Sequence, residues 1–229
     1  MKRSELNGLI ESAIQFIGEM HFPLPEFAYW KKEDWDSKGE EYDELFTNML
    51  GWDVTDFGCN NFSEIGLLIF MLRNGSFDHP DQYPKPYCEK LLIVEDGQCL
   101  PMHFHFRKME DIINRGGGVA LIKLYNSDEN EGLADTPVTV SLDGKKVVLE
   151  PGSVVRLNPG QSITLTPGLY HDIVAEKGSG KLLLGEVSTV SDDTVDNRFY
   201  EVSGRIPEIE EDCEPVYYIF KDYKEILGK

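Results

Sequence analysis

GQCLPMHFHFRKMEDIINRGG, residues 97–117, is the stretch of this sequence that says most about the fold. Successive side chains of a β-strand point to opposite faces, so His103 and His105 share one face and both imidazoles can reach one ion. A turn of four residues, FRKM, then brings the carboxylate of Glu110 into range. This mixed nitrogen and oxygen donor set suits Mn, Fe, Co, Ni or Zn. The stretch therefore predicts a strand that carries part of a metal site.

His171, in TPGLYHDIVAE, is the candidate for the fourth ligand. It lies 66 residues beyond His105, so only the fold can bring the two side chains together. Pro167 and Gly168 mark a turn just before it, which places His171 at the start of the following strand. In a β-barrel, that strand and the one that carries His105 are plausible facing strands.

The chain around these histidines, from Trp52 onward, predicts an antiparallel all-β body. Runs with a period near two are separated by turn residues such as Asp143-Gly144. Ten short strands are typical of a two-sheet barrel or sandwich. The runs are IGLLIFML (65–72), KLLIVE (90–95), CLPMHFHF (99–106), VALIKLY (119–125), PVTVSL (137–142), KVVLE (146–150), SVVRL (153–157), SITLTP (162–167), HDIVAE (171–176) and KLLLGEVSTV (181–190).

The two ends of the chain have a helical pattern instead. Apolar residues from Leu6 to Ile17 follow the i, i+3, i+4, i+7 spacing of an amphipathic helix, with Ser4 as its N-cap. A second short helix is expected around residues 40–50. We therefore predict a helical extension, residues 1–51, that packs on a barrel domain of residues 52–229, which ends in a strand, VYYIF, and a short helix, DYKEIL.

Composition limits the function. The chain has 229 residues, and its 22 basic and 41 acidic residues give a net charge of −19, which disfavours binding to nucleic acid or to anionic membranes. No stretch approaches the roughly 18 apolar residues of a membrane span. Four scattered cysteines without a CxxC pair indicate reduced thiols. We expect a soluble cytoplasmic protein, and the apolar stripe of the first helix favours a homodimer.

The spacing of Gly97, His103, His105, Glu110 and Gly117 resembles the first sequence motif of the cupin superfamily at every defined position. Cupins are double-stranded β-helix, or jelly-roll, barrels that bind one metal through three histidines and a glutamate. The resemblance therefore implies that fold and a ligand set of His103, His105, Glu110 and His171.

The second cupin motif is matched less closely, by Gly160, Pro167, Gly168 and His171. Its proline directly precedes the glycine, the spacing from Gly160 is one residue longer, and Ala175 replaces the usual asparagine. The histidine that carries the metal is retained.

Within the cupins, four segments resemble the D-lyxose ketol-isomerases, which also have an N-terminal helical extension. The resemblance implies a manganese enzyme that interconverts D-lyxose with D-xylulose and often D-mannose with D-fructose; Co²⁺, Fe²⁺, Ni²⁺ or Zn²⁺ would also suit the donors. The segments are HFHFRKMEDIINRGGG (103–118), GLYHDI (168–173), GEVSTVSDDTVDN (185–197) and GRIPEIEED (204–212).

Glu186 and Lys108 are the candidates for catalysis. Isomerisation moves one hydrogen between C1 and C2 of the sugar, either as a proton through an enediol or as a metal-assisted hydride shift, and the proton route needs a base. Glu186 shares strand parity with Leu182 and Leu184, which favours a side chain that faces inward. The alternative is a solvated carboxylate that faces outward. Lys108, inside the ligand loop, could stabilise an oxyanion or shuttle a proton, or could be a solvated loop lysine.

Four further residues are candidates for substrate binding because they offer the hydrogen-bonding groups that a polyol needs. Lys90 begins the strand before the histidine stretch, while Asp193, Arg205 and Glu208 lie in the family-like segments. GRIPEIEED could equally be an acidic surface loop. Two other functions stay open at this point: a cupin metal-dependent oxygenase or decarboxylase, and a sugar-binding cupin without catalysis.

Overall fold

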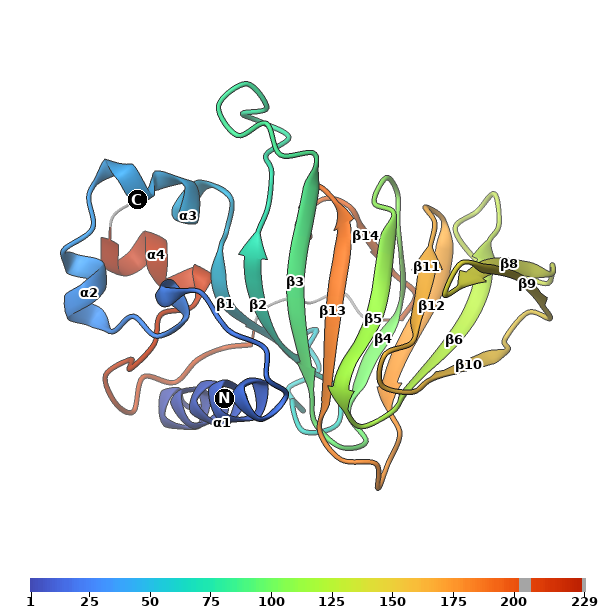
Figure 1. The fold of residues 1–229 in the computed structure, drawn as a ribbon, viewed down its shortest axis with the longest axis horizontal. Helices are drawn as coiled ribbons and strands as arrows, with labels where there is room; N and C mark the ends of the chain where they lie inside the picture. The colour runs from blue at the N-terminus through green and yellow to red at the C-terminus, as the bar shows by residue number, and fades with distance from the viewer. Residues whose placement is uncertain (202–206, 228–229) are drawn as a thin grey trace.

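Two antiparallel β-sheets curl against each other and enclose the core (Figure 1). The computed structural model describes residues 1–201 and 207–227. The larger sheet has the strand order β1-β2-β3-β13-β5-β11-β8-β9, and the smaller one the order β10-β6-β12-β4-β14, with β7 paired to β6. This arrangement confirms the predicted all-β cupin barrel.

The strands are mostly short, as the alternating sequence pattern predicted. Their bounds are β1 (Gly51–Thr55), β2 (Leu67–Arg73), β3 (Tyr87–Val94), β4 (Cys99–His105), β5 (Glu110–Gly117), β6 (Ala120–Ser127), β7 (Leu133–Ala134), β8 (Val138–Leu142), β9 (Lys145–Leu149), β10 (Val154–Leu157), β11 (Ser162–Leu165), β12 (Leu169–Ala175), β13 (Leu182–Thr189) and β14 (Asn197–Phe199).

The barrel core lies between the two sheets. Alternate side chains of the larger sheet, such as Leu92, Ile112 and Leu184, pack against Ile122 and Ile173 of the smaller sheet. Period-two alternation sends these residues to one face because neighbouring side chains on a strand point in opposite directions. One end of this interior is polar, and it forms the site described below.

Helices cover the outer face of the larger sheet at its β1 edge (Figure 1). Helix α1 (Arg3–Glu19) buries Leu6, Ile10 and Ile17 in a cluster that includes Phe70 of β2 and Leu183 of β13. Strand β2 is thus buried on both faces, which explains its continuous apolar sequence LLIFML. The shorter helices are η1 (Glu26–Ala28), α2 (Lys32–Asp36), η2 (Glu40–Tyr42), α3 (Asp43–Thr47) and α4 (Phe220–Leu227).

Three local predictions differ from the structure. VYYIF does not form a strand: only Ile219 makes an isolated bridge, to Trp52, and the buried aromatic side chains of Tyr217 and Tyr218 pack on other elements. Ser4 is not the N-cap of α1, because the helix begins at Arg3 and the Ser4 hydroxyl donates to Asp212 at 2.7 Å. Strands β1, β5, β7 and β14 were not among the expected runs. The division of the chain at residue 51 stays a prediction.

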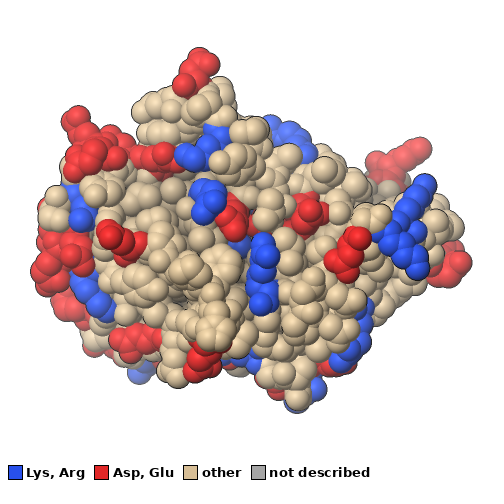
Figure 2. All heavy atoms as spheres, viewed as in Figure 1, with Lys and Arg blue, Asp and Glu red and all other residues tan. Residues whose placement is uncertain are grey.

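The molecular surface reflects the acidic composition. Figure 2 shows Asp and Glu side chains gathered at the end of the molecule that holds α2 and α3. None of the helices that the structure describes is long and apolar enough to span a membrane.

Candidate active site

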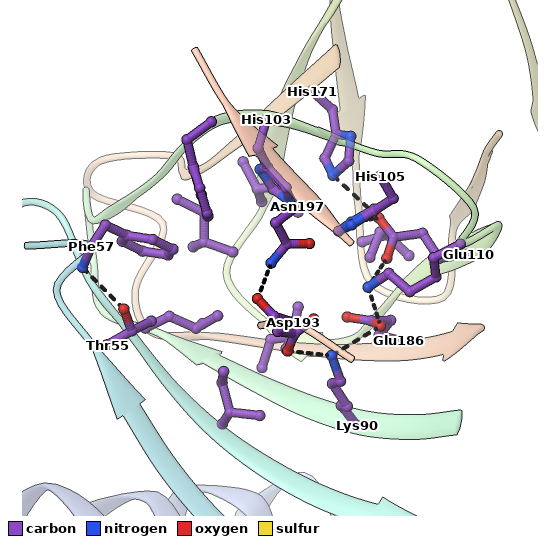
Figure 3. Close-up of a pocket in the computed structure, with 18 of the residues that line it drawn as sticks. Thr55, Phe57, Lys90, His103, His105, Glu110, His171, Glu186, Asp193 and Asn197 are labelled. Carbon is purple, nitrogen blue, oxygen red and sulfur yellow. Dashed lines mark hydrogen bonds and ion pairs between the residues drawn. The ribbon is translucent and has the colours of Figure 1, made fainter. Parts of the chain in front are cut away.

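A cavity of about 350 Å³ opens between the sheets at the polar end of the barrel (Figure 3). Strands β1, β2, β3, β4, β5, β12, β13 and β14 all contribute lining residues. One part of the wall is apolar and includes Phe57, Leu67 and Phe199, while the other carries titratable side chains. The cavity thus combines an apolar wall with convergent polar groups, as small-molecule sites do.

Three histidines meet at one side of this cavity. His103 of β4 lies opposite His171 of β12 in the strand register, and His105 shares the inward face of β4 with His103. One ring nitrogen from each of the three lies within 4.8 Å of the others. The cross-strand register therefore brings His171 beside His103 and His105, which lie 68 and 66 positions away in the chain.

Backbone hydrogen bonds set the orientation of two of these rings. His103 Nδ1 lies 2.8 Å from the carbonyl of Pro101, and His171 Nδ1 lies 3.0 Å from that of Leu169. A carbonyl oxygen only accepts, so each Nδ1 carries the proton and each Nε2 keeps its lone pair for a ligand. Burial, together with the neighbouring His171 and His105, holds the pKa of His103 well below its usual value, which keeps that ring neutral.

Glu110, the first residue of β5, completes the donor set. Its Oε1 lies 3.2 Å from His171 Nε2 and 3.4 Å from His105 Nε2. Burial alone would raise the pKa of Glu110, but Lys108 and His105 outweigh it and hold that pKa well below the usual value. Glu110 is therefore an ionised oxygen donor beside three imidazoles.

The chemistry of these four side chains fits a bound divalent metal. Both ring nitrogens of His105 are buried and lack a hydrogen-bond partner among the described residues. Buried polar atoms are seldom left unpaired, and a metal at Nε2 would satisfy one of them. Three imidazole nitrogens and one carboxylate oxygen could thus hold a metal ion, and this donor set suits several divalent metals.

A network of two lysines and three carboxylates extends from Glu110 across the cavity floor. Lys108 Nζ lies 2.8 Å from Glu110 Oε2 and 2.7 Å from Glu186 Oε1. Lys90 Nζ lies 3.4 Å from the same Glu186 oxygen and 2.9 Å from Asp193 Oδ2. Lys90 and Glu186 are register partners on β3 and β13, so both point into the barrel (Figure 3).

Both lysines remain charged although they are buried. Burial alone would lower the pKa of Lys108, but Glu110, Glu186 and Asp193 outweigh it and raise that pKa well above the usual value. Asp193 and Glu186 likewise outweigh the effect of burial on Lys90, whose pKa is raised. The network therefore places two permanent ammonium groups beside the metal donor set.

The structure brings eight of the ten predicted site residues together in the cavity and places Glu208 outside it. Glu208 is exposed and does not line the described cavity; its backbone carbonyl accepts a hydrogen bond from the N-terminal amine of Met1 at 3.0 Å. Arg205 lies outside the described residues. The eight predicted residues that line the cavity are Lys90, His103, His105, Lys108, Glu110, His171, Glu186 and Asp193.

Two site features were missed in the sequence, and both involve the end of the segment GEVSTVSDDTVDN. The buried carboxylate of Asp196 accepts the N–H groups of Arg107 and Lys108, each at 2.9 Å, and so holds the loop that carries Lys108. Asn197 lines the cavity on short strand β14. Neither residue belongs to a periodic run, and only their place in a family-like segment could have singled them out.

Aromatic side chains from distant parts of the chain close the apolar wall. Phe199 stacks on the His103 ring, with centroids 5.2 Å apart and planes at 27°. Phe57 packs against Phe199 at 5.5 Å between ring centroids. These rings shield the histidine cluster from water and restrict the orientation of His103.

Sequence comparisons agree with this geometry. The D-lyxose isomerase family profile matches residues 1–223. A D-lyxose/D-mannose isomerase of Serratia proteamaculans is 45% identical over 229 residues, covering 100% of both chains. A protein of the same name from Escherichia coli O157:H7 is 45% identical over 226 residues, covering 98% of this chain and 99% of the relative.

Solved structures with the same fold are more distant in sequence. The ligand-free L-ribose isomerase of Cellulomonas parahominis superposes with a TM-score of 0.60 at 18% identity, covering 92% of this chain and 98% of that one. The L-ribose isomerase of Geodermatophilus obscurus gives a TM-score of 0.59 at 17% identity, with the same coverage. These two structures support the fold, whereas the full-length relatives and the family profile establish the activity class. The chain belongs to the D-lyxose isomerase family and is a sugar isomerase.

Proposed function

We propose that this isomerase is metal-dependent and interconverts D-lyxose with D-xylulose and D-mannose with D-fructose. The observation that carries the proposal is the convergence, in one cavity, of a three-histidine and glutamate donor set with the buried pair Lys108 and Glu186. The names of the full-length relatives, D-lyxose/D-mannose isomerase, support the two aldoses.

His103, His105, Glu110 and His171 are the proposed ligands. The family resemblance favours Mn²⁺, and Co²⁺, Fe²⁺, Ni²⁺ and Zn²⁺ also suit the donors. When bound, such an ion polarises the sugar carbonyl and stabilises negative charge on its oxygen. The protein contributes by keeping Glu110 ionised and two imidazoles fixed through their Nδ1 hydrogen bonds.

Glu186 is the proposed base. In the aldose-to-ketose direction, its carboxylate takes the proton from C2, and the C2–H electrons form the double bond of an enediol as O1 gains a proton. The O2 hydroxyl then loses its proton, which balances the one that O1 gained, as the C2–O2 double bond forms, and Glu186 returns the C2 proton to C1. Lys90 and Lys108 hold Glu186 Oε1 from two sides, at 3.4 and 2.7 Å, and so fix the position of the base.

Lys108 is the proposed stabiliser of the charge that develops on the sugar oxygen. An ammonium group has three N–H donors, and the described contacts of Lys108 Nζ to Glu110 and Glu186 occupy two of them. The third remains for the sugar. Lys90 and Asp193 are proposed to bind hydroxyl groups further along the substrate, while the roles assigned to Arg205 and Glu208 remain predictions, as do a homodimer and a cytoplasmic location.

The test is to incubate the purified protein with Mn²⁺ and a panel of pentoses and hexoses, with and without a chelator. We expect conversion of D-lyxose and D-mannose that stops on chelation and returns with added metal. Turnover that survives complete removal of metal would contradict the proposal. Oxygen uptake would indicate a cupin oxygenase, and sugar binding without turnover a non-catalytic cupin.

A further inference from the structure

Asn197 occupies a position in the cavity that the mechanism above does not use. On β14, it lies opposite His105 of β4 in the strand register, and its neighbour Phe199 lies opposite His103. Paired residues of antiparallel strands point to the same face, so Asn197 points into the cavity with the histidines. Figure 3 shows its amide between the histidines and Asp193.

One end of this amide is anchored. The Asn197 Nδ2 group donates to the backbone carbonyl of Asp193 at 3.3 Å. Because a carbonyl only accepts, this contact determines which end of the amide is nitrogen. The Oδ1 atom is therefore the end that is free to meet a ligand.

The other end is buried and unpaired. Asn197 Oδ1 is buried and has no hydrogen-bond partner among the residues that the structure describes. An amide oxygen can only accept, so the group that pairs with it must be a donor. Beside a metal donor set in a monosaccharide site, the donor of the right size is a sugar hydroxyl group.

We propose that Asn197 is a substrate-binding residue whose Oδ1 accepts a hydrogen bond from one hydroxyl of the sugar, at a carbon other than the reacting C1 and C2. The assignment rests on the proposed function, which places C1 and C2 at the metal and at Glu186. It makes Asn197 a determinant of sugar specificity, because an acceptor at a fixed point distinguishes a sugar that presents a hydroxyl there from one that does not.

The test compares D-lyxose with its 3-deoxy, 4-deoxy and 5-deoxy analogues as ligands of the Mn²⁺-loaded protein, using calorimetry for affinity. We expect the wild type to bind one analogue about tenfold more weakly than D-lyxose. Asn197→Ala should abolish this tenfold difference in affinity. The affinities of the other two analogues relative to D-lyxose should stay unchanged. Asn197→Asp, which keeps an oxygen at this position, should preserve the difference even if overall affinity falls.

Arg198→Ala is the matched control, since Arg198 is the next residue of β14, points outward and pairs with Glu131 at 2.7 Å. It should leave all four affinities unchanged. An equal loss for all four sugars in Asn197→Ala would show that the residue only supports its loop, and would overturn the assignment. If the wild type converts D-lyxose but Asn197→Ala leaves all the affinity ratios unchanged, only the assignment of Asn197 is overturned. If the wild type binds none of the sugars, the proposed function is overturned as well.

Discussion

Two clusters of buried charge lie on opposite sides of the larger sheet, and they differ in how completely they are paired. Outside the barrel, the Arg3 guanidinium is only 2% exposed and donates four hydrogen bonds of 2.7–2.9 Å to Asp222 and Glu211. Inside the barrel, both nitrogens of His105 and the Oδ1 of Asn197 have no hydrogen-bond partner among the described residues.

The buried charges of the Arg3 cluster stabilise the fold, whereas those of the cavity are arranged to bind ligands. The Arg3 cluster joins the first turn of α1 to the first turn of α4, so the charge of Arg3 is paired within the protein. The cavity cluster keeps unused donors and acceptors that a metal and a sugar can satisfy. Changes in the two clusters should therefore affect different quantities: stability for the first, metal content and turnover for the second.

The largest effect is expected from His171→Ala. Removing one of the four donors should strip the metal and take turnover below detection, while the thermal unfolding of the metal-free protein stays close to that of the metal-free wild type. Elemental analysis and circular dichroism measure the two parts. His79→Ala, at an exposed histidine outside the cavity, is the control and should keep its metal. Full metal occupancy in His171→Ala would remove this residue from the ligand set.

Arg3→Met should affect stability instead. It leaves Asp222 buried without its cation, and breaking a buried ion pair in this way costs about 3–5 kcal/mol. Denaturant unfolding should show this loss, while kcat and metal content stay at wild-type values. Lys32→Met, which breaks the exposed pair with Asp36, is the control and should leave the free energy of unfolding close to the wild-type value. Loss of turnover in folded Arg3→Met would show that the two clusters are not independent.

Asp196→Asn tests the support of the loop that carries Lys108. The variant keeps an oxygen but loses the charge that accepts the N–H groups of Arg107 and Lys108. We expect kcat to fall about tenfold, a loss comparable to one charged hydrogen bond, with little change in KM or in metal content. An unchanged kcat would mean that the loop holds Lys108 in place without Asp196.

The smallest effect concerns pH. The hydrogen bond from Arg3 lowers the pKa of Glu211 below its usual value of 4.5. A carboxyl whose pKa is lower in the folded protein stabilises it above the unfolded pKa, and that contribution disappears as the pH falls through the folded pKa. The melting temperature of Glu211→Gln should therefore lie slightly below that of the wild type at pH 7, and the gap should close below pH 4.5. A difference in melting temperature that does not change with pH would show that the lowered pKa of Glu211 does not contribute to stability.

The sequence allowed the barrel and the metal donors to be predicted because both follow local rules. Alternation identified most strands, and the parity of the HFH stretch placed His103 and His105 on one face. Strand β5 was missed since EDIINRGG has no strict alternation, and its residues are fixed by pairing with β11 and β13. VYYIF has the composition of a strand, but its aromatic side chains are buried by other elements.

The remaining parts of the site depend on contacts between distant segments. Lys90 reaches Asp193 across 103 residues, and Asp196 reaches the Lys108 loop across 88. No spacing rule links such positions in one sequence, so the pairing of the two lysines and the role of Asp196 emerge only from the fold. The family resemblance pointed to the segments that hold Lys108, Asp193 and Asp196 without indicating what each residue does.

The proposed mechanism has Glu186 move a proton between C1 and C2 in a cavity where a metal would hold the sugar oxygens. Its most direct test is the Mn²⁺-loaded Glu186→Gln variant, with D-lyxose turnover followed in deuterated water by mass spectrometry of the product. We predict that the wild type incorporates solvent deuterium, and that the variant keeps its metal and its affinity for sugar but loses about 10²–10⁴-fold in kcat. A fully active Glu186→Gln enzyme whose product retains the original hydrogen would contradict the account and leave a hydride shift in its place.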